Sequence, residues 1–295
     1  MVISFNGLGN EGRLGNQMFQ YAFLRGVATN TNSDWIIPPE DAPRYDNYGL
    51  YDCFVLKNCE EKNRGESNFN DHVYREMHFN ESIFNWDQGD VNFSGNFQSE
   101  RYFENIIEQI REDFTFNDDY LKPCQEYINS IGGRDENIFL HVRRGSPNLT
   151  GRRGEKWSYQ MIQEYHPLCK KDYYLKALEH FPDKKVIVVS DTIDWCKEQD
   201  WLQDDRFLFS DSSYETFGDG ASVPYIDLCL MSLCGGAIIA NSSLSWWGAW
   251  LQNNTGKVIA PDPWFGSAYA HYNMKDMIPD RWVKVYNDPT PINIE

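Results

Sequence analysis

IFLHVRRGS, at residues 138–146, decides the fold, because an apolar run of the kind that forms a buried strand leads directly into two arginines. Further apolar runs follow at 186–189 (VIVV), 237–240 (AIIA) and 258–260 (VIA). Apolar spacing typical of helices covers residues 172–181, 192–199, 223–234 and 245–252. Buried strands that alternate with helices indicate βαβ units. The sequence therefore predicts an α/β protein with a doubly wound parallel sheet.

The N-terminal part of the chain predicts a second, less regular α/β region. Strands are expected at 2–5 and 35–37, and helices at 14–28, 101–114 and 119–131, whereas residues 40–98 are too mixed to assign. The last of these helices ends at the pair Gly132-Gly133, which is followed by charged residues. We place the domain boundary there, with an N-terminal domain over 1–135 and a C-terminal domain over 136–295.

Composition excludes several classes of protein. The 295 residues carry 27 basic and 44 acidic side chains, a net charge of −17, and 41 % of them are hydrophobic. The apolar content excludes a disordered chain, and the charge argues against binding to nucleic acid or to an anionic membrane. No apolar run approaches the roughly 20 residues that cross a bilayer, so no transmembrane segment is expected. The N-terminus lacks the pattern of a secretory signal.

The cysteines and the missing metal motifs add two expectations. The seven cysteines are odd in number and form no CxxC pair, so we expect reduced thiols and a cytoplasmic location. The chain contains neither HExxH nor DxD, and we therefore expect no metal site.

Polar residues follow three of the predicted strands where each strand ends. They are Arg143 and Arg144 after the first, Ser190 and Asp191 after the second, and Asn241, Ser242 and Ser243 after the third. In open parallel sheets, ligands bind beyond the carboxyl ends of the strands. Arginines and a helix N-terminus suit a nucleotide diphosphate, although a surface ion pair and an ordinary helix cap would also explain these residue types.

A glycine-rich segment near the N-terminus offers a competing interpretation. Residues 7–12 read GLGNEG, which fits the GxGxxG fingerprint of dinucleotide-binding proteins. The acidic residue expected at the end of the next strand is missing, because Pro38-Pro39 follows residues 35–37. A flexible turn explains the glycines better, and an NAD-dependent oxidoreductase is the third-ranked function.

Several stretches resemble the α-1,2-fucosyltransferases of glycosyltransferase family 11. They are GRLGNQMFQYA at 12–22, HVRRG at 141–145, SD at 190–191 with WCK at 195–197, DLCLMSLC at 227–234 and IIANSSLSWWGAWL at 238–251. A weaker match is FQSERYF at 97–103.

The resemblance implies a GT-B-like enzyme with two Rossmann-like domains facing a cleft. Such an enzyme would move L-fucose from GDP-β-L-fucose to a galactosyl hydroxyl with inversion. The N-terminal domain would bind the galactose-containing oligosaccharide acceptor, and the C-terminal domain the nucleotide. GDP-fucose would be a substrate, and no cofactor is implied.

The resemblance also assigns roles to residues. The catalytic candidates are Arg143, Arg144, Asp191 and Glu155. The candidates for donor binding are Arg13, Gly15, Asn16, Gln17, His141, Ser190, Asn241, Ser242 and Ser243. By analogy, the two arginines would hold the diphosphate and stabilise its charge as the fucosyl bond breaks. Trp246 and Trp250 share a helical face, and we expect both to be core residues rather than a stacking surface for the ligand.

Two positions depart from the family pattern. Ser146 stands where an aspartate usually follows HxRRG, and Gly236 stands where a histidine is common. The role of a base would then fall to Glu155 or Asp191, or the reaction would need little assistance from a base. The second-ranked function is accordingly a catalytically weakened relative that binds a GDP-sugar or a glycan.

Overall fold

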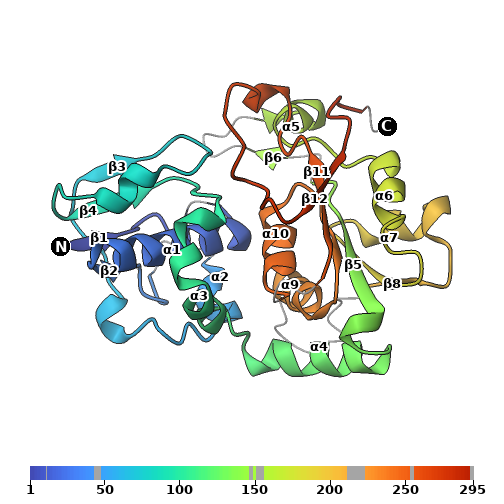
Figure 1. Cartoon of the computed structure of the whole chain (residues 1–295), viewed down its shortest axis with the longest axis horizontal. Coiled ribbons are helices and arrows are strands. Elements are labelled where there is room, and N and C mark those ends of the chain that lie inside the picture. The colour runs from blue at the N-terminus through green and yellow to red at the C-terminus, as the bar shows by residue number, and fades with distance from the viewer. Residues whose placement is uncertain are drawn as a thin grey trace. The chain divides into compact units, whose positions relative to one another are not determined.

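A computed structural model describes residues 1–10, 12–42, 48–145, 149–150, 156–210, 223–252 and 256–292. They form two compact units: Met1–Asp119 with Asn273–Pro279, and Tyr120–Tyr272 with Asp280–Glu295 (Figure 1). The first unit thus ends at Asp119, ahead of most of the helix α4 (Asp118–Ser130), whereas the sequence places the boundary at residue 135. The reason is that α4 packs on α9 (Val223–Leu233), where the Cys124 thiol lies 3.9 Å from the Ile226 carbonyl oxygen.

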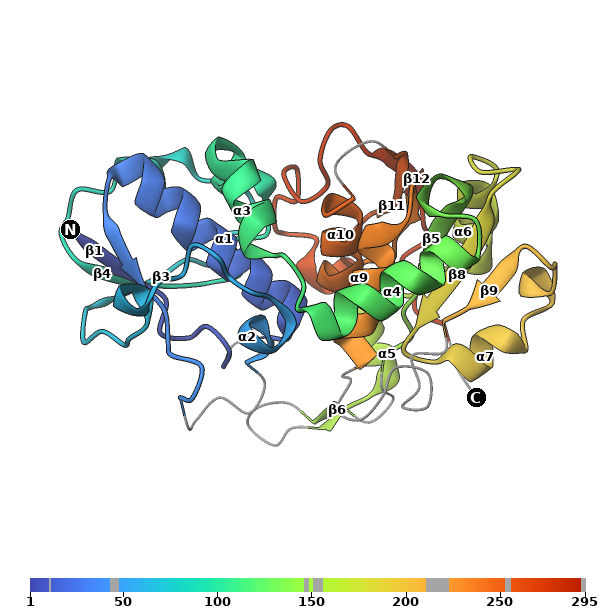
Figure 2. The ribbon, with the colours of Figure 1, turned by 90° about the horizontal axis from the view of Figure 1, so that it is seen from below.

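The first unit contains a four-stranded parallel sheet in the order β2-β1-β4-β3. Its strands are β1 (Val2–Ser4), β2 (Asp34–Ile36), β3 (Asp71–Val73) and β4 (Val91–Ser94). Figure 2 shows the long helix α1 (Leu14–Thr31) along one face of this sheet. The shorter helices are α2 (Gly49–Cys53) and α3 (Ile107–Asp113), with 3₁₀ turns at Glu61–Asn63 and Glu81–Asn85.

The helix predicted over 101–114 is wrong in its first half. The structure has separate 3₁₀ turns at Glu100–Tyr102 and Glu104–Ile106, and only Ile107–Asp113 is α-helical. Helix α1 carries a glycine, Gly26, where it meets the first of these turns. The carbonyl oxygen of Tyr102 occupies the place that a Cβ atom at Gly26 would need, so the backbones are in direct contact. Such close packing against α1 favours a tight turn over a continuous helix.

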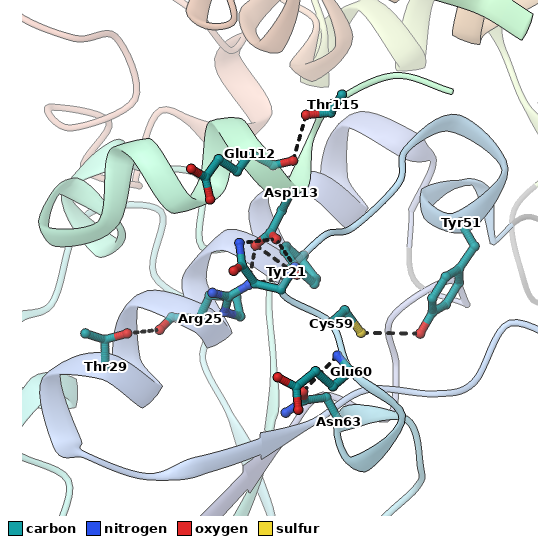
Figure 3. Close-up of polar contacts among 11 residues, drawn as sticks. Tyr21, Arg25, Thr29, Tyr51, Cys59, Glu60, Asn63, Glu112, Asp113 and Thr115 are labelled. Atoms are coloured by element: carbon teal, nitrogen blue, oxygen red, sulfur yellow. Dashed lines mark hydrogen bonds and ion pairs between the residues drawn. The ribbon is translucent and has the colours of Figure 1, made fainter. Parts of the chain in front are cut away.

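A buried ion pair ties the elements of the first unit together (Figure 3). Arg25 on α1 pairs with Asp113 at the end of α3, and the Asp113 side chain is fully buried. The Tyr21 hydroxyl donates to the same carboxylate at 3.0 Å, and the backbone and side-chain nitrogens of Asn58 each donate to it at 2.8 Å. The Arg25 guanidinium also lies 4.9 Å from the centre of the Trp35 ring. These hydrogen bonds compensate two charges that would be costly to bury alone.

The second unit contains a six-stranded parallel sheet in the order β12-β11-β10-β5-β8-β9. Its strands are β5 (Asn137–Val142), β8 (Lys185–Ser190), β9 (Phe207–Phe209), β10 (Ala237–Ile238), β11 (Val258–Asp262) and β12 (Val283–Tyr286). β6 (Leu149–Thr150) and β7 (Lys156–Trp157) form a separate antiparallel pair. The four strands predicted in this half are confirmed, and β9 and β12 extend the sheet at its edges.

Helices cover both faces of this sheet, which confirms the doubly wound arrangement (Figure 1). α6 (Lys171–Leu178) and α7 (Ile193–Lys197) lie on one side, and α9 and α10 (Ser243–Trp250) lie on the other. A further helix, α5 (Tyr159–Tyr165), follows β7. The core under α6 and α7 includes alternate residues of β5 and β8, among them Leu140 and Val188. Parallel sheets require cover of this kind on both faces.

The structure also bears on three further predictions from the sequence, which concern two tryptophans, the cysteines and membrane-spanning helices. Trp246 and Trp250 are both fully buried, as expected of core residues. Six of the seven cysteines are buried and Cys169 is half-buried, and none of the seven pairs with another. In the described part of the chain, no helix is both long enough and apolar enough to span a membrane.

Candidate functional site

The strand order of the second unit places a topological switch point between β5 and β10. From β5 the chain adds β8 and then β9 on one side, and it later adds β10, β11 and β12 on the other. The connections that follow β5 and β10 therefore leave the sheet in opposite directions, and at such a point open α/β sheets bind their ligands. Arg143 and Arg144 follow β5 directly, and Asn241 follows β10 after two residues. These three residues thus lie at the edge where such sheets bind ligands.

Arg143 contacts the β10 side of the switch point. Its Nη1 atom donates to the carbonyl oxygen of Asn241 at 3.4 Å. The side-chain amide of Asn241 donates to the carbonyl oxygens of Pro167 at 2.6 Å and Trp264 at 3.3 Å, and only 4 % of this residue is exposed. Asn241 therefore fixes two loops and the carbonyl group that Arg143 contacts. Its predicted part in donor binding would act through the position of Arg143.

Arg144 contacts the β8 side of the switch point. Its backbone N–H and that of Gly145 donate to the two carboxylate oxygens of Asp191, each at 2.9 Å. The guanidinium carbon lies 3.9 Å from the centre of the Trp195 ring on α7. The Tyr159 hydroxyl, at the start of α5, donates to the Arg144 carbonyl oxygen. Arg144 is thus held through both its backbone and its side chain.

The helix α10 begins at the same carboxyl edge. Ser242 precedes it in an extended conformation, and the Ser242 side chain makes no capping hydrogen bond. The Ser242 carbonyl accepts the Trp246 N–H at 3.0 Å, while the first N–H groups of a helix have no partner within the helix. A helix N-terminus of this kind carries partial positive charge and favours anions. Ser242, the residue before the helix, is buried, and Ser243, its first residue, is half-buried.

The other predicted residues of this unit have contacts within the protein. The Ser190 hydroxyl accepts the backbone N–H of Thr192 at 3.0 Å and so stabilises the turn before α7. His141 is buried on β5, and its carbonyl accepts the Tyr174 hydroxyl at 3.1 Å. Both residues support the strand ends that carry the arginines and Asp191.

Two ionisable groups beside the arginines are kept neutral. Burial raises the pKa of the Cys169 thiol to about 12, although the contact with Asn241 opposes this shift. Partial burial also raises the pKa of Tyr159, an effect that Arg144 opposes and Asp191 reinforces. At neutral pH both groups stay protonated, and neither provides a base or a thiolate nucleophile.

The predicted residues of the N-terminal motif lie in the first unit, at the start of α1. Arg13 is the exposed residue before the helix, and Gly15 is buried in its first turn. Gln98 donates to the Asn16 side-chain oxygen at 2.8 Å, and the Gln17 side chain accepts the Gly49 N–H at 3.0 Å. Gln17 therefore has a structural role in fixing the start of α2. The parts of all four residues in donor binding stay predictions.

The conformation and packing of the first unit explain two glycines of the GxGxxG segment, Gly9 and Gly12. Gly9 and Gly12 both adopt φ of +88°, a conformation that glycine tolerates best. A Cβ atom at Gly9 would also meet the Tyr48 ring at 2.6 Å, and one at Gly12 would meet the Asn16 side chain at 2.6 Å. Turn geometry and packing explain these glycines without a dinucleotide.

Gly236, one of the two departures from the family pattern, lies away from the arginines. It precedes β10, at the amino edge of the parallel sheet, whereas Arg143 follows β5 at the carboxyl edge. A Cβ atom there would meet Phe181 at 2.9 Å and Ile138 at 3.0 Å, so this structure has no room for an imidazole. Gly236 therefore gives no support to the interpretation as a weakened relative.

Some predicted positions have no structural account, and some contacts had not been predicted. Ser146 and Glu155 lie outside the described residues. Tyr159 and Trp195 were missed as site residues. The available signals for Trp195 were its place in the WCK stretch that resembles the family and its position four residues after Asp191. Among the described residues, no group of three His, Cys, Asp or Glu side chains lies close enough together to hold a metal ion.

Comparison with known proteins identifies related sequences. Residues 3–286 match the family described as Glycosyl transferase family 11. The chain is 31 % identical to an Alpha-1,2-colitosyltransferase of Escherichia coli, across 93 % of this chain and 96 % of that protein. It is 24 % identical to Galactoside alpha-(1,2)-fucosyltransferase 1 of Aotus nancymaae, across 82 % of this chain and 63 % of that protein.

Two solved structures resemble this chain in their fold. The fucosyltransferase NodZ from Bradyrhizobium matches with a TM-score of 0.54 at 11 % identity, over 89 % of this chain and 94 % of that chain. NodZ described as an alpha-1,6-fucosyltransferase and soaked with GDP-fucose matches with a TM-score of 0.53 at 12 % identity, over 89 % and 95 %. With the two parallel sheets described above, these matches confirm a GT-B-like α/β fold.

Proposed function

This chain belongs to glycosyl transferase family 11, and from that premise we propose that it transfers a deoxyhexose from a GDP-linked donor to a galactosyl hydroxyl. The names of two relatives support L-fucose or colitose as the sugar, since one is a colitosyltransferase and the other a fucosyltransferase. Colitose is L-fucose without the 3-hydroxyl group, so both donors have the same diphosphate. The same names support an α-1,2 linkage, which from a β-linked donor requires inversion at the anomeric carbon.

The observation that carries the proposal is the arginine pair at the switch point. Guanidinium groups bind phosphate oxygens in a planar, two-pronged geometry, and a diphosphate offers enough oxygens for both arginines. The first turn of α10 begins at the same edge and adds the N-terminal end of a helix dipole. In a protein with a net charge of −17, two adjacent arginines at this edge provide a local site for a small anion.

In the proposed reaction, negative charge develops on the leaving diphosphate, which the two arginines would bind. The bond between the sugar anomeric carbon and the β-phosphate oxygen breaks, and its electron pair stays on GDP. A new bond forms between the anomeric carbon and the acceptor oxygen, which loses its proton. Arg143 and Arg144 would stabilise the negative charge that grows on the leaving diphosphate. Because they supply the positive charge, we propose a reaction without a metal or other cofactor.

The roles of the two units follow from the same proposal. The second unit, which carries the switch point, would hold the nucleotide, and the first unit would bind the acceptor. Glu155 stays a candidate for accepting the proton of the acceptor hydroxyl.

A donor screen tests the proposed function. The purified full chain is incubated with lactose and with GDP-L-fucose, GDP-L-colitose or UDP-galactose, and product mass and linkage are measured. We expect a deoxyhexosyl product from at least one GDP donor, none from UDP-galactose, and the same rate with EDTA present. If neither GDP donor gives a product with any terminal β-galactoside tested, the proposal is wrong.

A further inference from the structure

Three elements converge on Arg144 in a way that the reaction outlined above does not use. Asp191 from the end of β8 accepts the backbone N–H groups of Arg144 and Gly145, and Trp195 from α7 lies under the guanidinium. Tyr159 from α5 donates to the Arg144 carbonyl. A strand, two helices and a loop therefore meet at one residue.

The carboxylate of Asp191 fixes the backbone. Gly145 adopts φ of +73°, which glycine accepts readily, and two consecutive N–H groups then point at one side chain. Hydrogen bonds to an ionised acceptor are stronger than those between neutral groups. The direction in which the Arg144 side chain leaves the backbone is thus set by Asp191.

The Trp195 ring fixes the side chain. At 3.9 Å from the ring centre, the guanidinium carbon is well within the range of a cation–π contact. The five N–H donors of arginine lie in the plane of the guanidinium group. An arginine that contacts a ring through the face of this group keeps its in-plane donors available to a phosphate.

We propose that Asp191 and Trp195 are positioning residues that hold Arg144 ready for the phosphates of the donor. This inference rests on the proposed function. It also gives Asp191 a role different from that of a base, since both its oxygens accept backbone N–H groups. Trp195 is half-buried against the core under α6 and α7, so leucine retains apolar contact there while losing the ring.

Ligand affinities separate positioning from general support of the fold. Isothermal titration with GDP and with guanosine compares the wild type with W195F, W195L, R144A and R144A/W195L. Guanosine lacks the phosphates, so it reports on the rest of the nucleotide site. We expect W195L to bind GDP roughly tenfold more weakly with guanosine affinity unchanged, whereas W195F retains most of the GDP affinity. In the R144A background, W195L should cause no further loss, because the two residues act through one contact.

Two further variants sharpen the test. D191N is expected to weaken GDP binding and to leave guanosine binding unchanged. W201L is the matched control, because Trp201 is a half-buried tryptophan of the same unit that stacks on Tyr174 rather than on a cation. It should lower the melting temperature without changing the preference for GDP over guanosine.

The outcomes distinguish the two proposals. If W195L and W195F both bind GDP as tightly as the wild type, or if the losses in R144A and W195L add, Trp195 does not position Arg144. If D191N leaves GDP affinity unchanged, the part assigned to Asp191 is overturned. Equal losses for GDP and guanosine indicate a structural role only and also overturn the inference. If the wild type itself fails to bind GDP, the proposed function fails and this inference falls with it.

Discussion

Arg143 and Arg144 are neighbours in the chain but have different surroundings. Arg143 contacts the Asn241 carbonyl on the β10 side, and Arg144 contacts Trp195 on the β8 side. A diphosphate bound between them would meet one guanidinium from each side of the switch point. The two arginines are therefore expected to be separately necessary.

Lysine substitutions test whether charge alone is sufficient. R143K and R144K each retain the positive charge but lose the planar fork that binds two oxygens at once. We expect each to lower kcat for transfer by about 10- to 100-fold, with R144K more severe because lysine also loses the flat contact with Trp195. Steady-state rates at saturating donor check this. Rates equal to wild type in both variants would show that a point charge is enough.

At the level of elements, the sequence predicts the continuous apolar strands and the polar residues at their carboxyl ends. β5, β8, β10 and β11 are apolar enough to be recognised, and the polar residues after them do gather at one edge. β9 has three residues and β12 alternates valine with polar residues, so neither has the pattern of a buried parallel strand. The contacts of Tyr159 and Trp195 depend on how α5 and α7 pack, which local sequence does not determine.

The ion pair between α1 and α3 is another tertiary feature without a local sequence signal. Arg25 and Asp113 belong to helices that appear separate in the sequence (Figure 3). Through Asp113, the pair also joins these helices to the loop at Asn58. Burial also raises the pKa of Tyr21 well above its usual value, and Asp113 raises it further. The first unit therefore depends on a polar cluster as well as on its apolar core.

Removing one partner of this ion pair should destabilise the first unit strongly. D113N leaves Arg25 buried without a counter-charge, and we expect a loss of about 3–5 kcal/mol in the free energy of unfolding. The control is K62M, which breaks the exposed pair between Lys62 and Glu60 of the same unit and should cost roughly 1 kcal/mol or less. Urea denaturation of both variants checks the comparison. Similar small losses in both would mean that the buried pair adds little.

At the scale of the whole molecule, buried phenols and thiols make stability sensitive to alkaline pH. Burial raises the pKa values of Tyr173 and Tyr174 well above that of free tyrosine, and it raises the pKa of Cys169 to about 12. The folded protein therefore keeps these protons at a pH where the unfolded chain has lost them. Their contribution to stability is complete below about pH 8.5 and declines as pH rises toward the folded-state values.

A pH series measures this dependence. Between pH 8 and 10.5 we expect the urea midpoint to fall, because each such group costs roughly 1.4 kcal/mol per pH unit once the unfolded-state pKa is passed. Y173F removes one titrating phenol. Above pH 10, its free energy of unfolding should therefore fall less steeply with pH than that of the wild type, by the equivalent of about one proton. An unchanged midpoint across the series would contradict this account of the buried groups.

In the proposed function, the arginine pair at the switch point holds the diphosphate of a GDP-linked deoxyhexose. The most direct measurement is the initial rate of sugar transfer to a terminal galactoside by the wild type and by R144A, using the donor that the screen selects. We predict an α-1,2-linked product from the wild type and a rate about 10²- to 10³-fold lower for folded R144A. A rate for R144A within twofold of the wild type would contradict the claim.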